Sequence, residues 1–378
     1  MSLLLLLLFT TAALAGPPSK PDKTCTPFRI PLNITAPYYN IDISIATNWD
    51  LSSYIFNASR RDSQQVFHPI TSNQTLTTYP TIAATFCTPS TPTANSSTLL
   101  LLTHGSMTSG IYWDPPAYPQ HSFVQHALAA GYSVFYYDRL GTGSSSLDDP
   151  ISRVQYAPQV EILRQLTTLL RGSSSSSPSR YTPGASISKI VQVGHSFGAF
   201  LAASAIASDD DPRGDALVLT GFSGLFAYLG LWTTGGQARV AALQDPKKFG
   251  TFAKGYLVPA DEYAFAFGGF KEPFFDRKVT GWLWERQAPF AIAELLTAGT
   301  FPLDFGKVKT PVQVVVGRYD LPSCGGFCDG LLNQTAALFT GAREVEVRGD
   351  FDGGHLLNYH FDGKKSFDAI TGWIGRAI

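Results

Sequence analysis

One short stretch constrains the fold of this chain more than any other part of its sequence. Residues 194–198 read GHSFG and stand between an apolar run at 189–193 and a run of small residues that begins at Ala199. These flanking patterns predict a buried strand before the motif and a helix after it. A serine between two glycines in that setting predicts a sharp turn that lifts the serine hydroxyl above the sheet, beside the first N–H groups of the helix. We therefore predict that Ser196 is a nucleophile rather than part of an ordinary turn.

A serine hydroxyl is a poor nucleophile unless a base takes its proton and an acid orients that base. After a turn of this kind, the acid and then the base are expected later in the chain, at the ends of late strands. Asp320 directly follows the apolar strand pattern that begins at residue 311, and His355 lies in a glycine-rich loop after the last strand pattern, which begins at residue 343. We predict that Ser196, Asp320 and His355 form a catalytic triad.

Other side chains compete for these roles. Asp304 precedes the strand and would emerge at its wrong end, Asp329 lies beyond the loop between Cys324 and Cys328, and His360 is expected at the surface. His195 neighbours the nucleophile, but we expect it to point elsewhere on the turn and to have a packing role. None of these four side chains is assigned to catalysis.

The negative charge that develops on a substrate oxygen needs hydrogen-bond donors that are already in place. The backbone N–H of Phe197 is one expected donor because Phe197 follows the nucleophile. The second is expected from the HGSM turn after the apolar run 98–103, from Ser106 or from Met107. The loop 138–144, DRLGTGS, has too short a glycine pattern for a dinucleotide or Walker site, so we expect it to pack beside the active site.

The order of the remaining patterns predicts the fold class. Apolar strand runs alternate with amphipathic helical runs along the middle of the chain, which predicts a mostly parallel sheet with helices on both faces. The expected strands are 98–103, 132–137, 189–193, 215–224, 311–320 and 343–355, and the expected helices include 122–130 and 154–172. Residues 28–46 and 80–88 predict an antiparallel start, and the serine-rich stretch 173–179 predicts a solvated linker.

The pattern changes between about residues 225 and 305, where strand runs vanish and aromatic residues crowd into short helical pieces. We predict that this segment is a mainly helical cap over an apolar pocket, although many of its aromatic side chains will be ordinary core residues. The expected organisation is a signal peptide, a core with an inserted cap, and the rest of the core: 1–15, 16–224, 225–305 and 306–378.

The first residues, MSLLLLLLFTTAALAG, predict a secretory signal peptide that is cleaved after Ala15. The apolar run is shorter than the roughly 20 residues that a membrane anchor needs. Only 15% of the residues are charged, and N-glycans would offset that low surface charge. Five sequons could carry them: Asn33, Asn57, Asn73, Asn95 and Asn333. We expect a secreted protein, with retention in the secretory lumen as the alternative.

The chain has four cysteines, which allow three pairings in an oxidising compartment. We favour Cys25 with Cys87 and Cys324 with Cys328, because the second pair encloses a flexible loop that lets both sulfurs meet. A zinc site would want more cysteine or histidine ligands at suitable spacing. The formal net charge of -1 gives no electrostatic case for binding nucleic acid.

Taken together, these motifs resemble the α/β-hydrolase superfamily over roughly residue 30 to the C-terminus. The resemblance rests on an H-G turn after the third strand, a D-x-x-G-x-G-x-S loop after the fourth and a G-x-S-x-G turn after the fifth, here residues 104–105, 138–145 and 194–198. The chain is also similar to secreted α/β hydrolases of filamentous fungi, which share a Y-W-D motif, here residues 112–114. The resemblance implies an eight-stranded, mostly parallel sheet and hydrolysis of esters through an acyl-enzyme.

Within this superfamily, epoxide hydrolases and haloalkane dehalogenases carry Asp at the position of Ser196, which argues against both activities. Proline iminopeptidases tend to have G-G-S-W-G and an acidic site for a free amine, and this chain offers neither clearly. We expect a cofactor-free and metal-free serine hydrolase that acts on a small-molecule carboxylic ester with an apolar portion. The alternatives are a thioesterase, a lactonase or an acyltransferase of fungal secondary metabolism, and a non-catalytic ligand-binding relative. The sequence leaves the oligomeric state and the acyl chain length open, and it predicts no stable insertion into a membrane.

Overall fold

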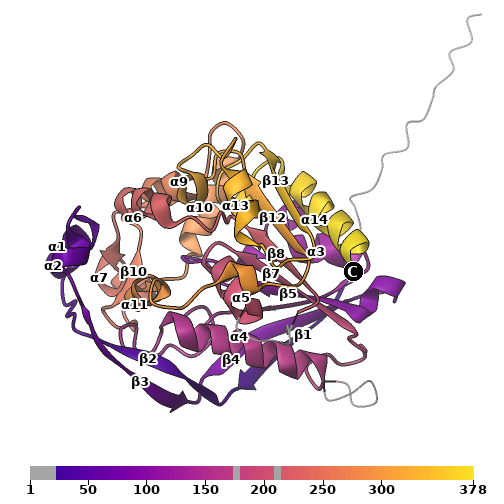
Figure 1. Ribbon diagram of the computed structural model, residues 1–378, viewed down its shortest axis with the longest axis horizontal. Coiled ribbons are helices and arrows are strands. Elements are labelled where there is room, and N and C mark those ends of the chain that lie inside the picture. The colour runs from indigo at the N-terminus through magenta and orange to yellow at the C-terminus, as the bar shows by residue number, and fades with distance from the viewer. Residues whose placement is uncertain (1–22, 173–178, 208–213) are drawn as a thin grey trace, which may run out of the picture.

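The structure is a computed structural model that describes residues 23–172, 179–207 and 214–378 (Figure 1). The expected signal peptide, residues 1–15, and most of the expected serine-rich linker, residues 173–178, lie outside the described residues. Among the described residues, no helix combines the length and the apolar character needed to cross a bilayer.

A central sheet of eight strands confirms the predicted fold class. Its strand order is β1-β4-β6-β5-β7-β8-β12-β13, and neighbouring strands run parallel from β6 to β13. Only β1 with β4 and β4 with β6 pair antiparallel, as the expected antiparallel start requires. The bounds are β1 (Lys23–Pro31), β4 (Thr81–Pro89), β5 (Thr98–Thr103), β6 (Ser133–Tyr137), β7 (Lys189–His195), β8 (Ala216–Thr220), β12 (Val312–Gly317) and β13 (Val345–Phe351).

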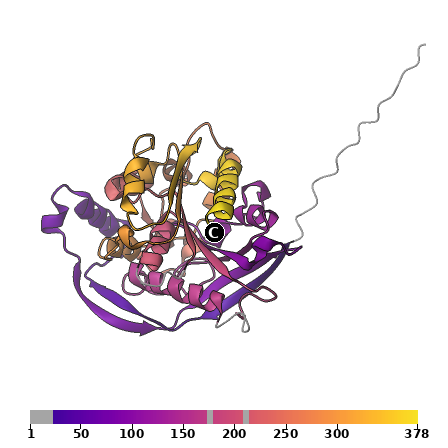
Figure 2. The ribbon, with the colours of Figure 1, turned by 45° about the vertical axis from the view of Figure 1, so that its right-hand side comes forward.

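Helices cover both faces of this sheet, and the side chains of β5 show how. Leu99 and Leu101 pack into one core together with α4 (Tyr156–Arg171) and α5 (Phe197–Ala207). Leu100 and Leu102 point the other way, into a core with α3 (Phe123–Ala129) and α14 (Gly363–Ala377). Figure 2 shows the magenta α4 and the yellow α14 on opposite sides of the strands. Because both faces are covered, every residue of β5 is buried, as its unbroken apolar run predicted.

The N-terminal region contains strands within 28–46, as expected, but only β1 joins the central sheet. β2 (Ile34–Ile41) pairs with β3 (Ile70–Thr78) in a separate two-stranded sheet, and α1 (Asn48–Ser59) and α2 (Ser63–Val66) lie between them in the chain. A capping box starts α1: the Thr47 hydroxyl accepts the Asp50 N–H, and the Asp50 carboxylate accepts the Thr47 N–H at 2.8 Å. Asn48 then fastens α1 to the rest of the protein, since its side-chain oxygen accepts the Val240 N–H at 2.8 Å.

The segment between β8 and β12 is mainly helical, as predicted. It contains α6 (Leu229–Gly236), α7 (Ala241–Gln244), α8 (Pro246–Phe249), α9 (Glu262–Gly269), α10 (Arg277–Glu285) and α11 (Ile292–Ala298). It also contains a small sheet that the sequence did not predict, formed by β9 (Arg239–Val240), β10 (Tyr256–Val258) and β11 (Phe290–Ala291). Strands of two or three residues are too short to give a recognisable alternation of polar and apolar residues.

Both favoured cysteine pairs are joined by disulfides in the structure. Cys25 and Cys87 lie directly opposite each other on β1 and β4, so their bond ties the edge strand to its neighbour. Cys324 and Cys328 close a short loop after β12. The remaining short helices near the carboxyl ends of the late strands are α12 (Leu321–Cys324) and α13 (Leu332–Leu338).

Candidate active site

The turn at Ser196 connects β7 directly to α5, as the flanking sequence predicted. Ser196 has a φ of 55°, a left-handed backbone conformation that is rare for a residue with a side chain. A Cβ atom on Gly194 would lie 2.4 Å from the Gly198 carbonyl oxygen, and one on Gly198 would lie 2.3 Å from the Thr103 carbonyl oxygen. In both cases the added Cβ would meet a backbone atom, which cannot move away as a flexible side chain can. The tight turn therefore requires glycine at both positions.

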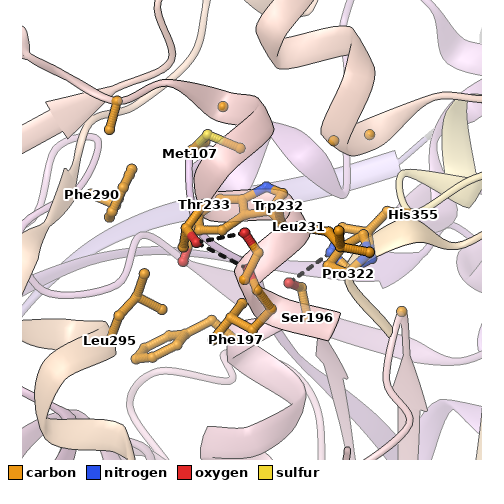
Figure 3. Close-up of a pocket in the computed structure, with 18 of the residues that line it drawn as sticks. Met107, Ser196, Phe197, Leu231, Trp232, Thr233, Phe290, Leu295, Pro322 and His355 are labelled. Atoms are coloured by element: carbon orange, nitrogen blue, oxygen red, sulfur yellow. Dashed lines mark hydrogen bonds between the residues drawn. The ribbon is translucent and has the colours of Figure 1, made fainter. Parts of the chain in front are cut away.

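The three residues predicted to form a triad are brought together by the fold. The His355 Nε2 atom lies 2.8 Å from the Ser196 Oγ atom (Figure 3), and the His355 Nδ1 atom lies 2.9 Å from the Asp320 Oδ2 atom. Ser196 follows β7, Asp320 follows β12 and His355 follows β13. Because these strands run parallel, their carboxyl ends meet at the same edge of the sheet, which is where ligands bind in open α/β sheets.

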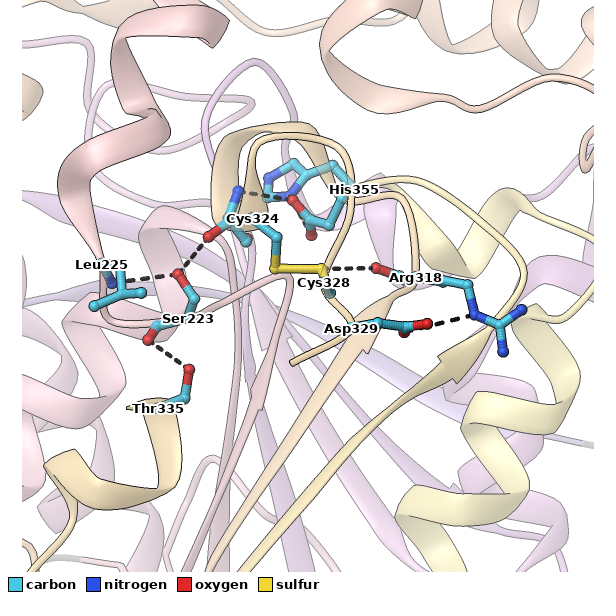
Figure 4. Close-up of a disulfide and its surroundings, with 11 residues drawn as sticks. Ser223, Leu225, Arg318, Cys324, Cys328, Asp329, Thr335 and His355 are labelled. Atoms are coloured by element: carbon cyan, nitrogen blue, oxygen red, sulfur yellow. Dashed lines mark hydrogen bonds and ion pairs between the residues drawn. A yellow bond between two sulfur atoms is a disulfide. The ribbon is translucent and has the colours of Figure 1, made fainter. Parts of the chain in front are cut away.

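Asp320 is fully buried and is held by its own helix. It is the N-cap of α12, and its Oδ1 atom accepts the Ser323 N–H at 2.9 Å. The backbone carbonyl of Asp320 accepts the N–H groups of Cys324 and Gly326, both at 3.1 Å. Figure 4 shows the disulfide of this loop beside His355. The carboxylate is therefore fixed by a cap, by backbone hydrogen bonds and by a covalent loop.

The structure contradicts the expectation that His360 lies at the surface. Its side chain is 1% exposed, and its Nε2 atom accepts the Gly354 N–H at 2.9 Å and the Lys271 N–H at 3.2 Å. The proton on its Nδ1 atom then points at the Leu356 carbonyl, 3.0 Å away. Gly354 and Leu356 flank His355 in the chain, so His360 orders the loop that carries His355. Burial lowers the pKa of His360 to about 4.

His195 has the packing role that was expected of it, but its ring packs against His355 and lines the cavity instead of pointing elsewhere on the turn. Its ring stacks on Tyr112 with centroids 4.3 Å apart and lies 4.9 Å from the His355 ring. Its Nδ1 atom lies 3.1 Å from the Thr220 hydroxyl. Burial first, and then the neighbouring His355 and His104, hold the pKa of His195 well below its usual value. The neutral His195 ring, itself stacked on Tyr112, therefore packs against His355.

The two competing aspartates lie apart from the triad. Asp304 caps a short 3-10 helix, with its carboxylate accepting the Gly306 N–H at 3.0 Å. Asp329 is 56% exposed and lies 3.8 Å from the Arg318 Nε atom. Both have the surface or local roles that the sequence indicated.

The expected oxyanion donors lie beside Ser196. Ser106, Met107 and Phe197 all line the same cavity as Ser196. In the described part of the chain, none of their three backbone N–H groups donates a backbone hydrogen bond. The Cα of Gly105 approaches Ser196 so closely that a Cβ there would lie 2.8 Å from the Ser196 Cβ.

The loop at 138–144 packs beside this turn, as expected. The Asp138 carboxylate accepts the Ser144 N–H at 2.7 Å and the Gly110 N–H at 2.8 Å. It therefore closes its own loop and also holds the chain segment that follows the HGSM turn. The neighbouring buried ion pair between Arg139 and Glu294 was not predicted from the sequence.

Ser196 opens into a cavity of about 1010 Å³ (Figure 3). Its lining includes the apolar side chains of Met107, Leu231, Trp232, Phe290 and Leu295. Most of these come from the helical segment between β8 and β12. Among the described residues that line the cavity, there is no aspartate, glutamate or lysine.

One wall of the cavity comes from α1, which the sequence analysis did not predict. Tyr54, Ile55 and Ala58 of this helix line the cavity. Tyr54 and Ile55 also pack on the apolar cluster that contains Trp232 and Phe290. The capping-box pattern at residues 47–50 was the signal that could have revealed the helix.

In the described residues, no group of three or more His, Cys, Asp or Glu side chains could hold a metal ion.

Comparison with known proteins agrees with this fold. Residues 99–363 match the model of the alpha/beta hydrolase family. That match spans most of the chain, so this protein belongs to the alpha/beta hydrolase family. No curated protein sequence matches the chain.

Solved structures support the same fold at low sequence identity. A bromoperoxidase from Bacillus anthracis superposes with a TM-score of 0.53 and 19% identity, covering 78% of this chain and 96% of that one. A thermophilic esterase from Thermogutta terrifontis superposes with a TM-score of 0.52 and 16% identity, covering 79% of this chain and 94% of that one. A monoacylglycerol lipase from Paleococcus ferrophilus superposes with a TM-score of 0.51 and 12% identity, covering 79% of this chain and 99% of that one. The similarity establishes the fold.

The crowding at the turn predicts a large loss of stability on substitution of Gly198 by alanine. The added Cβ meets two backbone carbonyl oxygens, those of Thr103 at 2.3 Å and His104 at 2.5 Å. We expect Gly198→Ala to lower the free energy of unfolding by about 3 kcal/mol or more, measured by urea denaturation. The control is Gly299→Ala, where an added Cβ has no neighbour within 4 Å. Equal stability of the two variants would contradict the packing described here.

The burial of His360 predicts a loss of stability in acid. Its pKa is about 4 in the folded protein and near 6.5 when unfolded, so between these values the unfolded chain binds a proton that the folded protein excludes. The free energy of unfolding therefore falls as the pH falls through that window, by up to roughly 3 kcal/mol from this group. His360→Gln should show a shallower pH dependence in urea denaturation between pH 7 and pH 4. His68→Gln, at an exposed histidine, should keep the wild-type slope. Identical slopes for all three proteins would refute this role for His360.

Proposed function

We propose that this protein is a serine hydrolase that cleaves carboxylic esters with an apolar portion. The observation that carries the proposal is the chain of contacts from the Ser196 hydroxyl through the His355 imidazole to the buried Asp320 carboxylate. This arrangement supplies a nucleophile, a general base and a group that orients the base. The family membership and the esterase and lipase neighbours support the reaction type.

The geometry suggests a two-step reaction. In the first step, His355 Nε2 accepts the Ser196 proton as the Ser196 oxygen attacks the ester carbonyl. The tetrahedral intermediate collapses, the bond to the alcohol oxygen breaks, and the imidazolium gives its proton to the departing alcohol. In the second step, a water molecule loses a proton to His355 and attacks the acyl-enzyme. The proton then returns to the Ser196 oxygen as the carboxylic acid leaves.

Asp320 sets which nitrogen of His355 accepts the proton. The Nδ1–H group donates to the carboxylate, so Nε2 carries the free lone pair and faces Ser196. The same carboxylate stabilises the imidazolium that forms during each step. Burial of Asp320 strengthens this interaction because little solvent screens it.

We assign the oxyanion hole to the backbone N–H groups of Phe197 and Ser106. Phe197 begins α5, whose N-terminal N–H groups have no partner within the helix. Ser106 is favoured over Met107 because the Gly105 Cα lies against the Ser196 Cβ, which brings the Gly105–Ser106 peptide next to the reacting hydroxyl. Met107 instead contributes its side chain to the apolar cluster of the pocket.

The cavity favours an apolar part of the ester. Its lining is rich in aromatic and aliphatic side chains and has no carboxylate among the described residues. A carboxylate would be needed to bind the free amine of a peptide, so this lining disfavours aminopeptidase substrates. Its volume of about 1010 Å³ is large enough for a medium or long acyl chain.

Secretion and N-glycosylation are also part of the proposal. Two disulfides are expected in an oxidising compartment. Asn33, Asn73, Asn95 and Asn333 have exposed side chains, and Asn57 is half-buried. Cleavage by an N-glycosidase followed by mass spectrometry of the secreted protein would identify the occupied sites.

Replacing the proposed nucleophile tests the mechanism. Ser196→Ala should lower kcat on p-nitrophenyl butyrate by about 10⁴-fold or more, since the acyl-enzyme can no longer form. A fluorophosphonate probe should label wild type and should not label the variant. Circular dichroism should show that the variant is folded, because its backbone conformation is unchanged. Equal labelling of the two proteins would rule out Ser196 as the nucleophile.

The α1 wall predicts a change of chain-length preference. Ile55→Trp places a larger side chain in the cavity and should lower kcat/KM for p-nitrophenyl decanoate relative to the acetate, roughly tenfold. Trp49→Ala is the matched control, since Trp49 lies on the same helix and is 85% exposed. An unchanged ratio of the two kcat/KM values in Ile55→Trp would show that α1 does not contact the acyl chain.

A further inference from the structure

A buried arginine lies behind the proposed oxyanion hole, and the mechanism above does not use it. Arg139 follows β6 in the loop 138–144, and its side chain is 1% exposed. Its guanidinium donates through Nη1 to Glu294 and to Gln159 and through Nη2 to the Gly105 carbonyl oxygen at 3.3 Å. It also lies over the Phe197 ring, 4.8 Å from the centroid. One side chain thus touches both segments that carry the proposed oxyanion donors.

The contact with Gly105 matters because of which peptide group it engages. The Gly105 carbonyl and the Ser106 N–H belong to the same planar peptide unit, so fixing the carbonyl fixes the direction of the N–H. Hydrogen bonds to the carbonyl also polarise the peptide and strengthen its N–H as a donor. A cationic donor gives a larger effect than a neutral one. Arg139 therefore acts on the proposed oxyanion donor without touching the substrate.

The Gly105 carbonyl accepts a second hydrogen bond, from His104. The Arg139 backbone N–H donates to the His104 Nε2 atom at 3.0 Å, so the ring proton sits on Nδ1. That Nδ1–H donates to the Gly105 carbonyl oxygen at 2.8 Å. His104 is fully buried, and burial together with the Arg139 charge keeps its pKa well below the usual value. The Arg139 side chain thus contacts the Gly105 carbonyl oxygen directly, and the Arg139 backbone N–H acts on the same oxygen through His104.

Glu294 connects this arrangement to the segment between β8 and β12. It lies in α11, is fully buried, and accepts hydrogen bonds from Arg139 and from the Gln159 side-chain nitrogen at 2.8 Å. Other residues of α11 and the helical segment line the acyl cavity, including Leu295. An ion pair this deeply buried is costly to assemble, and a single partner left behind would be an uncompensated charge.

We propose that Arg139 is a positioning residue of the oxyanion hole, held in place by Glu294 of α11. It orients and polarises the Gly105–Ser106 peptide so that the Ser106 N–H meets the developing negative charge. This inference rests on the proposed serine hydrolase mechanism. It adds a function to a loop that the sequence assigned only to packing.

The test distinguishes the effect of the Arg139 charge from the effect of its hydrogen bond to the Gly105 carbonyl oxygen. Arg139→Lys keeps a cation for Glu294 but lacks the planar fork that also contacts the Gly105 carbonyl. We expect kcat on p-nitrophenyl butyrate to fall roughly tenfold or more, approaching the effect of losing one oxyanion donor, with KM within about twofold. The inhibition constant of a trifluoromethyl ketone, whose adduct with Ser196 places an oxyanion in the hole, should rise by the same factor.

Arg171→Lys is the matched control, because Arg171 forms an ion pair with Asp215 at 2.9 Å away from the cavity lining. It should leave kcat, KM and the inhibition constant unchanged. Melting temperatures of all variants separate a stability effect from an effect on the site. If folded Arg139→Lys loses stability but keeps wild-type kcat and inhibitor affinity, Arg139 is only structural and the inference is wrong.

Glu294→Gln provides a second route should Arg139→Lys not fold. It keeps the volume of the side chain and an acceptor for Arg139 but removes the charge that holds the guanidinium. We expect kcat and ketone affinity to fall together by at least about threefold at constant KM, and unchanged values in a folded variant would overturn the proposal. Wild-type protein that neither hydrolyses esters nor reacts with the fluorophosphonate would instead reject the proposed function itself.

Discussion

The crowding of backbone around Ser196 is the constraint on which the site depends. A left-handed conformation costs a residue with a side chain roughly 1–2 kcal/mol, and Ser196 can pay it only inside a turn that its neighbours enforce. The Ser196 N–H donates to the Thr220 carbonyl of β8 at 2.9 Å, so the strained residue is also tied to the sheet. The direction of its hydroxyl is therefore set by strand packing, before any substrate binds.

The partners of Ser196 are fixed by separate means that point to the same place. Asp320 is held by capping its own helix. His355 is held through its neighbours Gly354 and Leu356, which bond to the buried His360, and by its contact with the His195 ring. These supports come from strands and loops that are far apart in the chain and meet at the carboxyl edge of a parallel sheet. A site preorganised in this way needs little rearrangement when charge develops during the reaction.

The same organisation couples the site to the pocket. Met107 belongs both to the turn beside Ser196 and to the apolar cluster with Trp232 and Phe290, so the wall of the cavity begins next to the Ser196 hydroxyl. The Arg139–Glu294 pair makes a second connection, through charge rather than through apolar packing. Changes in the helical segment between β8 and β12 can therefore affect the proposed oxyanion hole as well as the proposed acyl site.

How much of this could be predicted from the sequence depended on whether the signal was local. The strand before Ser196 and the helix after it, the order of Asp320 and His355, and the buried run of β5 are all properties of short segments, and the structure reproduces their placement. The burial of His360 was missed because it depends on residues from another segment, such as Phe270 and Lys271. The Arg139–Glu294 pair was missed for the same reason, since its members lie 155 positions apart.

The central claim is that the acyl group of the substrate passes through a covalent bond to Ser196. The most direct measurement is to mix the protein with a p-nitrophenyl ester, quench with acid within the first turnovers, and locate any added mass by peptide mass spectrometry. Our account predicts an adduct with the mass of the acyl group on the peptide that contains residues 194–198, at Ser196. Steady ester hydrolysis with no adduct, or with the adduct on a different side chain, would contradict it.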